Sequence, residues 1–281
     1  MIVEPAPAKI NLALHVRRRR PDGYHDIETL FAFCRDGDVV TVEAAERNRF
    51  TITGPFAGIL SPPSAGGALW SGNLVTDAAD AFASCFAIDQ PHAIALDKRL
   101  PIASGIGGGS ADAAATLRAL ARLHGVASDD DQLIAIAINL GADVPACLRS
   151  ETVLGTGRGD ALVAIDGLPG MPVLLVNPGV AVSTAAVFRA WDGVDRGAIS
   201  GGALLDRARA GRNDLAVPAR ALAPAIDAVL AMLEAAPGVS IARMSGSGAT
   251  CFALFDDVAA RDAIAARAVA RGWWHLASSL V

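Results

Sequence analysis

The residues best suited to chemistry begin with a glycine-rich stretch, Ser104-Gly105-Ile106-Gly107-Gly108-Gly109-Ser110. Glycine leaves the backbone N–H groups uncovered, and the alanine-rich sequence after Ser110 predicts that a helix follows directly. Uncovered N–H groups at the positive end of a helix dipole form an anion site, and phosphate is the usual anion. A flexible linker or a helix capped by Ser110 is the alternative. Pro101 ahead of the stretch and the helix behind it favour phosphate binding.

Lys9 is the second candidate, because lysine is rare in this chain. Among 24 basic residues the only lysines are Lys9 and Lys98. Where arginine has replaced most lysines, a lysine that persists suggests a role for a compact ammonium group. Lys9 lies in an apolar stretch predicted as a strand, where an unpaired ammonium is costly to bury. An edge lysine whose side chain reaches solvent is the alternative interpretation.

Asp143 is the third candidate. It follows Gly141, which ends a predicted helix over 132–140, and it precedes Val144-Pro145. A carboxylate held on such a rigid turn could orient or deprotonate a hydroxyl group. A lone aspartate at a turn is, on local sequence alone, more often a helix cap.

Composition limits the class of protein. The chain has 281 residues, 52% of them hydrophobic, which is enough for two medium domains. Its net charge of −5 argues against a nucleic-acid-binding protein, and we see no apolar run long enough to span a membrane. The four cysteines are scattered and no secretion signal is visible, so we expect a cytoplasmic protein. The basic run Arg17–Arg20 is interpreted as a solvated strand end, with attraction of an anionic substrate as the alternative.

Strands and helices are mixed without regular alternation, which predicts an α+β fold with an antiparallel component. Asp36-Gly37-Asp38 is read as a turn, 39–42 and 50–53 as an antiparallel pair, and 54–67 as a loop. We predict strands over 2–16, 24–33, 92–98, 171–179, 251–255 and 273–277, and helices over 73–86, 132–140, 218–234 with a break at Pro224, and 258–270, besides one that ends near His124-Gly125 and one that begins at Ser183.

Three segments taken in order resemble the three motifs of the GHMP kinases: Pro-Ala-Lys-Ile-Asn-Leu at 7–12, the glycine-rich stretch, and Ser-Gly-Ser-Gly-Ala at 245–249. Further segments are similar to the branch of this superfamily that acts on a cytidyl-linked methylerythritol. They are Asp22-Gly23-Tyr24-His25, Gly141-Ala142-Asp143-Val144-Pro145, Gly155-Thr156-Gly157-Arg158-Gly159 and Asn213-Asp214-Leu215. Together with the first two segments above, these four make six motifs in order across nearly the whole chain. Each motif alone is weak, but the six together are specific.

The resemblance implies a ribosomal-S5-like N-terminal domain and a ferredoxin-like C-terminal domain, with the active site in the cleft between them. We expect an ATP-binding domain over 1–152 and a substrate-side domain over 153–281. The implied reaction moves the γ-phosphate of ATP, with Mg²⁺, to the 2-hydroxyl of 4-CDP-2-C-methyl-D-erythritol in the non-mevalonate isoprenoid pathway. The substrate and ATP are the only partners expected.

The resemblance also implies roles for individual residues. Asp143 orients or deprotonates the hydroxyl, and Lys9 beside it lowers the pKa of that hydroxyl. Tyr24 and Phe188 stack on the cytosine, His25 bonds its edge, and Asn11 contacts the substrate. Core aromatics and a turn-capping histidine are the alternatives for Phe188 and His25. The residues implied on the ATP side are Asn73, Lys98, Pro101, Ser104, Gly105, Gly107, Gly108, Gly109 and Ser110.

One position departs from the family pattern. Ala216 stands where the family often has an acidic residue after Asn-Asp-Leu, so that segment receives no catalytic role. Metal ligands and oligomeric state receive no prediction.

The alternative functions are those of another GHMP kinase with a mevalonate- or homoserine-like substrate, and of a non-catalytic nucleotide-binding regulator. A dehydrogenase is disfavoured, because Ser110 stands where a dinucleotide-binding loop has its third glycine.

Overall fold

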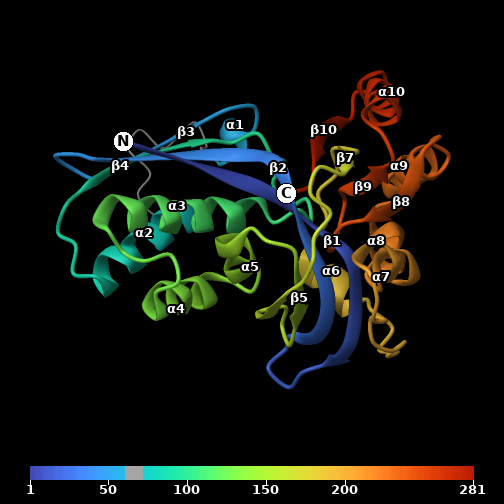
Figure 1. Ribbon diagram of the computed structural model, residues 1–281, viewed down its shortest axis with the longest axis horizontal. Helices are drawn as coiled ribbons and strands as arrows, with labels where there is room; N and C mark the ends of the chain where they lie inside the picture. Colours follow the sequence, from blue (N-terminus) through green and yellow to red (C-terminus); the bar gives the residue numbers. More distant parts are fainter. Residues whose placement is uncertain (61–71) are drawn as a thin grey trace. The chain divides into compact units, whose positions relative to one another are not determined.

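The computed structural model describes residues 1–60 and 72–281 and contains two compact units (Figure 1). Unit 1 comprises Met1–Ala8, Gly37–Ile102 and Gly107–Arg149, and unit 2 comprises Lys9–Asp36, Ala103–Ile106 and Ser150–Val281. The long strands β1 (Ile2–Arg19) and β2 (His25–Ala44) contribute residues to both units. The units are therefore discontinuous in sequence, and the expected domains 1–152 and 153–281 remain a prediction.

Unit 1 combines a strand group with a helical layer. The second half of β2 pairs antiparallel with β4 (His92–Asp97), and β4 pairs parallel with β3 (Arg49–Thr53). Figure 1 shows α2 to α5 on one side of these strands. Alanines from Ala111 to Ala121 are buried on α3, and such small side chains let the neighbouring α2 pack closely. The helices are α1 (Ala57–Leu60), α2 (Leu74–Cys85), α3 (Gly108–His124), α4 (Asp131–Leu140) and α5 (Val144–Arg149).

Two predictions about β2 are wrong. The expected turn at Asp36-Gly37-Asp38 is absent, because β2 runs through it without a break. Gly37 instead allows the backbone of β2 to lie close to that of β1, because a Cβ at this position would lie 2.0 Å from the carbonyl oxygen of Ala6. The expected pairing of 39–42 with 50–53 is also wrong, since β4 lies between β2 and β3. The predicted loop 54–67 contains α1, and its residues from 61 onward lie outside the described part of the chain.

Unit 2 contains an antiparallel four-stranded sheet of β7 (Pro172–Asn177), β8 (Val239–Met244), β9 (Cys251–Phe255) and β10 (Trp274–Ser279). The strand order is β10-β7-β9-β8, with helices between β7 and β8 and between β9 and β10. This is the βαββαβ arrangement of a ferredoxin-like fold, as predicted. The remaining elements of unit 2 are β5 (Val153–Thr156), β6 (Ala161–Ala164), α6 (Thr184–Arg189), α7 (Leu204–Ala210), α8 (Ala216–Leu222), α9 (Ala225–Glu234) and α10 (Val258–Val269).

Local signals set the helix ends. Asp130 and Ser183 accept backbone N–H groups of the first turns of α4 and α6, and Gly125 ends α3 in a left-handed conformation. Pro224 separates α8 from α9, as the sequence predicted. Within the described residues, no helix is both long enough and apolar enough to cross a membrane.

Candidate active site

The glycine-rich stretch leads into the N-terminus of α3. Gly107 is the N-cap residue, in a left-handed conformation with φ of 67°, and no side chain caps the helix. The alternative of a helix capped by Ser110 is therefore excluded, because Ser110 lies in the first turn. The leading N–H groups of this 17-residue helix lack a capping side chain, and the helix dipole favours negative charge at the same point. The start of α3 can therefore bind an anion such as phosphate.

Lys98 lies beneath this helix start in unit 1. Its ammonium group, 2% exposed as a residue, donates to Asp38 Oδ2 at 2.6 Å and to Asp112 Oδ2 at 2.5 Å. A Cβ on Gly108 would lie 3.1 Å from Lys98 Nζ, so a glycine at this position lets the ammonium group lie close to the helix start. Burial tends to lower the pKa of Lys98, but the charges of the two aspartates outweigh it and raise that pKa. The lysine therefore stays charged next to the anion site.

The two aspartates have different surroundings. Asp38 Oδ1 also accepts the backbone N–H groups of Arg99 and Leu100, at 2.5 and 2.8 Å. Asp112 Oδ1 is buried and has no hydrogen-bond partner among the described residues. Burial raises the pKa of Asp112 to about 8, against the opposing effect of Lys98. Asp112 therefore releases its proton at a higher pH than an ordinary aspartate.

Three further predicted residues belong to unit 1. Asn73 is the N-cap of α2 and accepts the N–H of Val75 at 2.9 Å. The α2 start adjoins the glycine-rich stretch, because a Cβ on Gly109 would lie 3.6 Å from the Leu74 side chain. Pro101 is buried. Asp143 lies in the turn between α4 and α5, and its carbonyl accepts the N–H of Cys147 at 3.0 Å.

In unit 2, Lys9 lies on β1 and is 3% exposed. Its Nζ donates to Asn11 Oδ1 at 3.1 Å and lies 4.9 Å from the centre of the Phe31 ring. Asn11 Nδ2 in turn donates to Thr29 Oγ1 at 2.8 Å. Lys9 and Asn11, predicted separately as site residues, are thus bonded to each other, and Thr29 holds Asn11 against β2.

The third glycine motif forms a turn, Ser245–Gly248, that touches two predicted site residues. Ser245 Oγ accepts the N–H of Asn11 at 3.1 Å and donates to the carbonyl of Gly105 at 2.9 Å. Next to it, the N–H of Thr250 donates to the carbonyl of Ser104 at 3.1 Å. Sequence analysis identified the motif but gave Ser245 no role. Its partners are 234 and 140 residues away in the chain.

An aromatic group includes the predicted base-binding residues. The His25 ring lies 4.9 Å from Phe188 and 5.7 Å, edge-on, from Trp191. Tyr24 is 54% exposed, with the Arg158 guanidinium 5.3 Å from its ring centre. Burial, together with the charge of Arg19, lowers the pKa of His25, so its ring is neutral at pH 7.

Two buried ring nitrogens of this group, His25 Nε2 and Trp191 Nε1, have no hydrogen-bond partner in the described part of the chain. A planar polar ligand would supply such partners. Sequence analysis missed Trp191, which lies just after α6 and donates its N–H to the carbonyl of Phe188 at 3.3 Å.

The basic side chains Arg17–Arg20 at the end of β1 all form ion pairs or hydrogen bonds within the protein. Arg17 bonds Glu28 and Asp195, Arg18 bonds Asp26, and Arg20 bonds Asp22 and Asp26. Arg19 donates to the carbonyls of Arg189 and Trp191, which fixes the end of α6. These pairs favour the interpretation as a strand end over an anion-attracting patch.

Two family models match the chain, one in each half. Residues 73–151 match the GHMP kinases N terminal domain and residues 200–272 the GHMP kinases C terminal domain. The 4-diphosphocytidyl-2-C-methyl-D-erythritol kinase of Rhizorhabdus wittichii is 56% identical, over 99% of this chain and 94% of that protein. The protein of the same name from Novosphingobium aromaticivorans is 48% identical, over 99% and 92%.

Solved structures agree with these matches. A crystal structure of 4-(cytidine 5'-diphospho)-2C-methyl-D-erythritol kinase has a TM-score of 0.79 and 32% identity, with 99% of each chain covered. A crystal structure of mevalonate kinase has a TM-score of 0.70 at 11% identity, over 100% of this chain and 99% of that one. The second match shows a shared fold.

Proposed function

Since the chain belongs to the GHMP kinases and, among them, to the family of the 4-diphosphocytidyl-2-C-methyl-D-erythritol kinases, we propose that it transfers the γ-phosphate of ATP to the 2-hydroxyl of 4-CDP-2-C-methyl-D-erythritol. The observation that carries the proposal is 56% identity to a kinase of that name over 99% of the chain. An aromatic group with unpartnered ring nitrogens supports a nucleobase-bearing substrate.

We assign the phosphate-transfer chemistry to Asp143 and Lys9. Asp143 would orient the acceptor hydroxyl and take its proton, as a fixed carboxylate can. Lys9 would stabilise the charge that develops on the acceptor and on the transferred group. The bond from Lys9 to Asn11 supports this role, because it fixes the direction of the ammonium group.

The ATP side is assigned to the start of α3. Gly107, Gly108, Gly109 and Ser110 would bind the phosphates through backbone N–H groups, together with Ser104 and Gly105 just before them. Lys98 would support that loop from below, since its ammonium is bonded to two aspartates. Asn73 and Pro101 complete the proposed nucleotide side.

The cytosine side is assigned to Tyr24, His25 and Phe188, with Asn11 toward the sugar alcohol. The exposure of Tyr24 supports this assignment, because a buried core aromatic could not stack on a ligand. A neutral His25 ring offers one donor and one acceptor, which suits the donor-and-acceptor edge of a cytosine.

We also propose that Mg²⁺ enters with ATP. Among the described residues no group of three or more histidine, cysteine, aspartate or glutamate side chains could hold a metal ion. Protein-bound Mg²⁺ commonly keeps several waters and relies on substrate phosphates, so a site built mainly by ATP fits this chain. The ion would neutralise charge on the transferred phosphate. We place the enzyme in the cytoplasm, where ATP is available.

The direct test is release of ADP from Mg-ATP by the purified protein. We expect turnover with 4-CDP-2-C-methyl-D-erythritol and none with mevalonate, homoserine or galactose. Turnover with one of the small alcohols would replace the proposed substrate. No turnover with any of the four would favour the nucleotide-binding regulator.

Asp143→Asn tests the proposed base separately. We expect turnover to fall by about 100-fold or more while ATP binding is kept. Asp131→Asn is the matched control, because Asp131 is an exposed aspartate at the start of α4. Equal turnover in the two variants would mean that Asp143 is structural.

A further inference from the structure

Asn213 holds the Ser245–Gly248 turn from the side. Its Nδ2 donates to the carbonyls of Met244 and Gly246, both at 2.8 Å, and its Oδ1 accepts the N–H of Leu215 at 2.9 Å. The residue is 7% exposed, so water does not replace these bonds. Both N–H groups of this amide are therefore used to fix two carbonyls at the turn, and its oxygen holds the chain just after Asn213.

Fixing a carbonyl also fixes the N–H of the next residue, because the two point in opposite directions in a trans peptide. With the Met244 carbonyl turned to Asn213, the N–H of Ser245 points away and donates to the carbonyl of Thr250 at 2.9 Å. Ser245 is the residue whose hydroxyl bonds both Asn11 and Gly105. The amide of Asn213 thus determines where that hydroxyl lies.

Asn213 itself is anchored to β1 on both sides. The N–H of Leu14 donates to the carbonyl of Arg212 and the N–H of Asp214 to the carbonyl of Leu14, at 2.8 and 2.9 Å. Asp214 Oδ2 accepts the N–H of Val16 at 2.8 Å. Asn213 therefore lies at a fixed position beside the strand that also carries Lys9 and Asn11.

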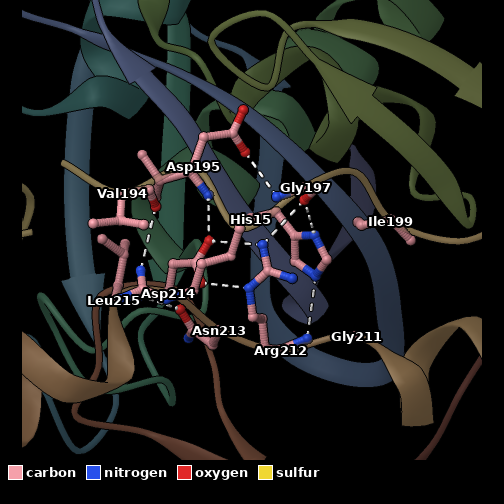
Figure 2. A network of polar contacts seen from close by, with 12 residues as sticks. His15, Val194, Asp195, Gly197, Ile199, Gly211, Arg212, Asn213, Asp214 and Leu215 are labelled. Carbon is pink, nitrogen blue, oxygen red and sulfur yellow. Dashed lines mark hydrogen bonds and ion pairs between the residues drawn. The ribbon is translucent and has the colours of Figure 1, made fainter. Parts of the chain in front are cut away.

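His15 and Arg212 extend this anchor to the segment before α7. Figure 2 shows His15 and the Arg212 side chain converging on Gly197. The N–H of Arg212 donates to His15 Nε2 at 3.2 Å, so the ring proton is on Nδ1, which donates to the carbonyl of Gly197 at 2.9 Å. Asn213 is thus held within a closed polar network rather than on a free loop.

From these contacts we propose that Asn213 is a positioning residue for the kinase reaction. It holds the Ser245–Gly248 turn so that Ser245 fixes the backbone of Asn11, and Asn11 in turn directs the ammonium of Lys9. The inference rests on the proposed function for the reaction it serves, but the contacts it predicts are testable without turnover. The carboxylate of this segment, Asp214, is bonded to Arg212 and to the N–H of Val16, so the segment acts through Asn213 by placement.

Asn213→Asp tests the proposal with the same side-chain size. One carboxylate oxygen keeps the bond to the N–H of Leu215, while the other faces two carbonyl oxygens that have no proton to donate. Asn177→Asp is the matched control: Asn177 is 3% exposed and bonds the N–H of Gly179 through Oδ1 and Thr250 Oγ1 through Nδ2. The hydroxyl of Thr250 can turn and donate, so this second carboxylate stays paired.

The expected result has two parts. Asn213→Asp lowers kcat for the cytidyl substrate by about 30-fold and leaves KM for ATP unchanged, because a displaced Lys9 costs chemistry and not nucleotide binding. Hydrogen exchange at the N–H of Asn11 speeds up by about 10-fold or more, since its acceptor has moved. Asn177→Asp changes neither quantity. Should Asn213→Asp fail to fold, Asn213→Ser serves in its place, because a serine can bond the N–H of Leu215 but cannot reach the two carbonyls.

Equal kcat in the Asn213 and Asn177 variants overturns the proposal, as does unchanged exchange at Asn11. A parallel fall of kcat and of the urea unfolding midpoint in both variants also overturns it, since that pattern is general destabilisation. If the natural protein has no turnover with the cytidyl substrate, the proposed function fails. The exchange at Asn11 then still decides whether Asn213 positions it.

Discussion

The buried cluster of Lys98, Asp38 and Asp112 predicts how the stability of this protein depends on pH. One ammonium faces two carboxyl groups, and the second carboxyl has an oxygen without a hydrogen bond in the described part of the chain. Asp112→Asn removes the surplus acid and keeps an oxygen for Lys98. The substitution leaves Lys98 paired with Asp38, so no buried charge loses its last partner.

The sign follows from where the proton is held. Burial raises the pKa of Asp112 to about 8, whereas an aspartate in the unfolded chain titrates near pH 4. Between these values the folded protein holds a proton that the unfolded chain has released. The free energy of unfolding therefore falls as pH rises, by about 1.4 kcal/mol per pH unit at most for this one group. Below about pH 4 and above about pH 8 the contribution is flat.

Asparagine has no proton to lose, so the variant lacks this slope. We expect the difference in unfolding free energy, Asp112→Asn minus the natural protein, to rise by roughly 3 kcal/mol from pH 5 to pH 7 in favour of the variant. Urea unfolding of both proteins at half-unit steps of pH, at constant ionic strength, measures it. Parallel curves over pH 5 to 8 would refute the reasoning, since they would mean that Asp112 is ionised throughout or that the cluster opens to water.

Three further predictions concern other sites. Gly105→Ala places a Cβ 2.5 Å from the carbonyl oxygen of Ser245 and should lower the free energy of unfolding by about 3 kcal/mol. Gly125→Ala is the control: Gly125 has a similar φ but open space around it, so its loss should be about 1 kcal/mol. Equal losses in the two variants would exclude the contact as the cause. Arg243→Met removes the donor to three backbone carbonyls and should cost about 3 kcal/mol in urea unfolding, and a neutral result would show that water replaces it. Tyr24→Leu should raise KM for the cytidyl substrate about 10-fold without a change in unfolding midpoint, and an unchanged KM would remove Tyr24 from the base site.

Sequence could predict the elements whose signals are local. The break at Pro224, the caps at Asp130 and Ser183 and the end of α3 at Gly125 each depend on residues within one helical turn. The strand order of unit 2 followed from the resemblance to the GHMP kinases, not from these signals. Nothing in the strand sequences themselves says which strand lies beside which.

The wrong predictions have the same cause. Gly37 in an Asp-Gly-Asp sequence has the composition of a turn, but its neighbour is Ala6, 31 positions earlier on another strand. The pairing of 50–53 failed because a strand from 92–97 takes the place beside β2. In both, a contact distant in sequence outweighs a local preference.

The candidate site shows this division residue by residue. Lys9 and the glycine-rich stretch were predicted from their residue types, and Asn11 from the resemblance to the GHMP kinases. The roles of Ser245 and Asp112 were not predicted. Ser245 bonds both Asn11 and Gly105, and Asp112 bonds Lys98 together with Asp38. Each role depends on segments that are distant in the sequence. Asp112 looks like an ordinary residue of an alanine-rich helix in the sequence.

The two lysines of this chain have similar surroundings in the structure. Both lysines are buried, and each ammonium is bonded to side-chain oxygens: Lys9 to Asn11, and Lys98 to two aspartates that converge from different segments. An ammonium group has its N–H donors around one nitrogen and can donate in several directions, whereas a guanidinium is planar and wider. At Lys98 the limit on size is visible, since a Cβ on Gly108 would already lie 3.1 Å from Nζ. Many arginines at this protein's surface form ion pairs that a lysine could also make, whereas Lys98 is buried and bonded to two carboxyl groups. Composition alone thus pointed to two buried ammonium groups, and one of them lies between two aspartates.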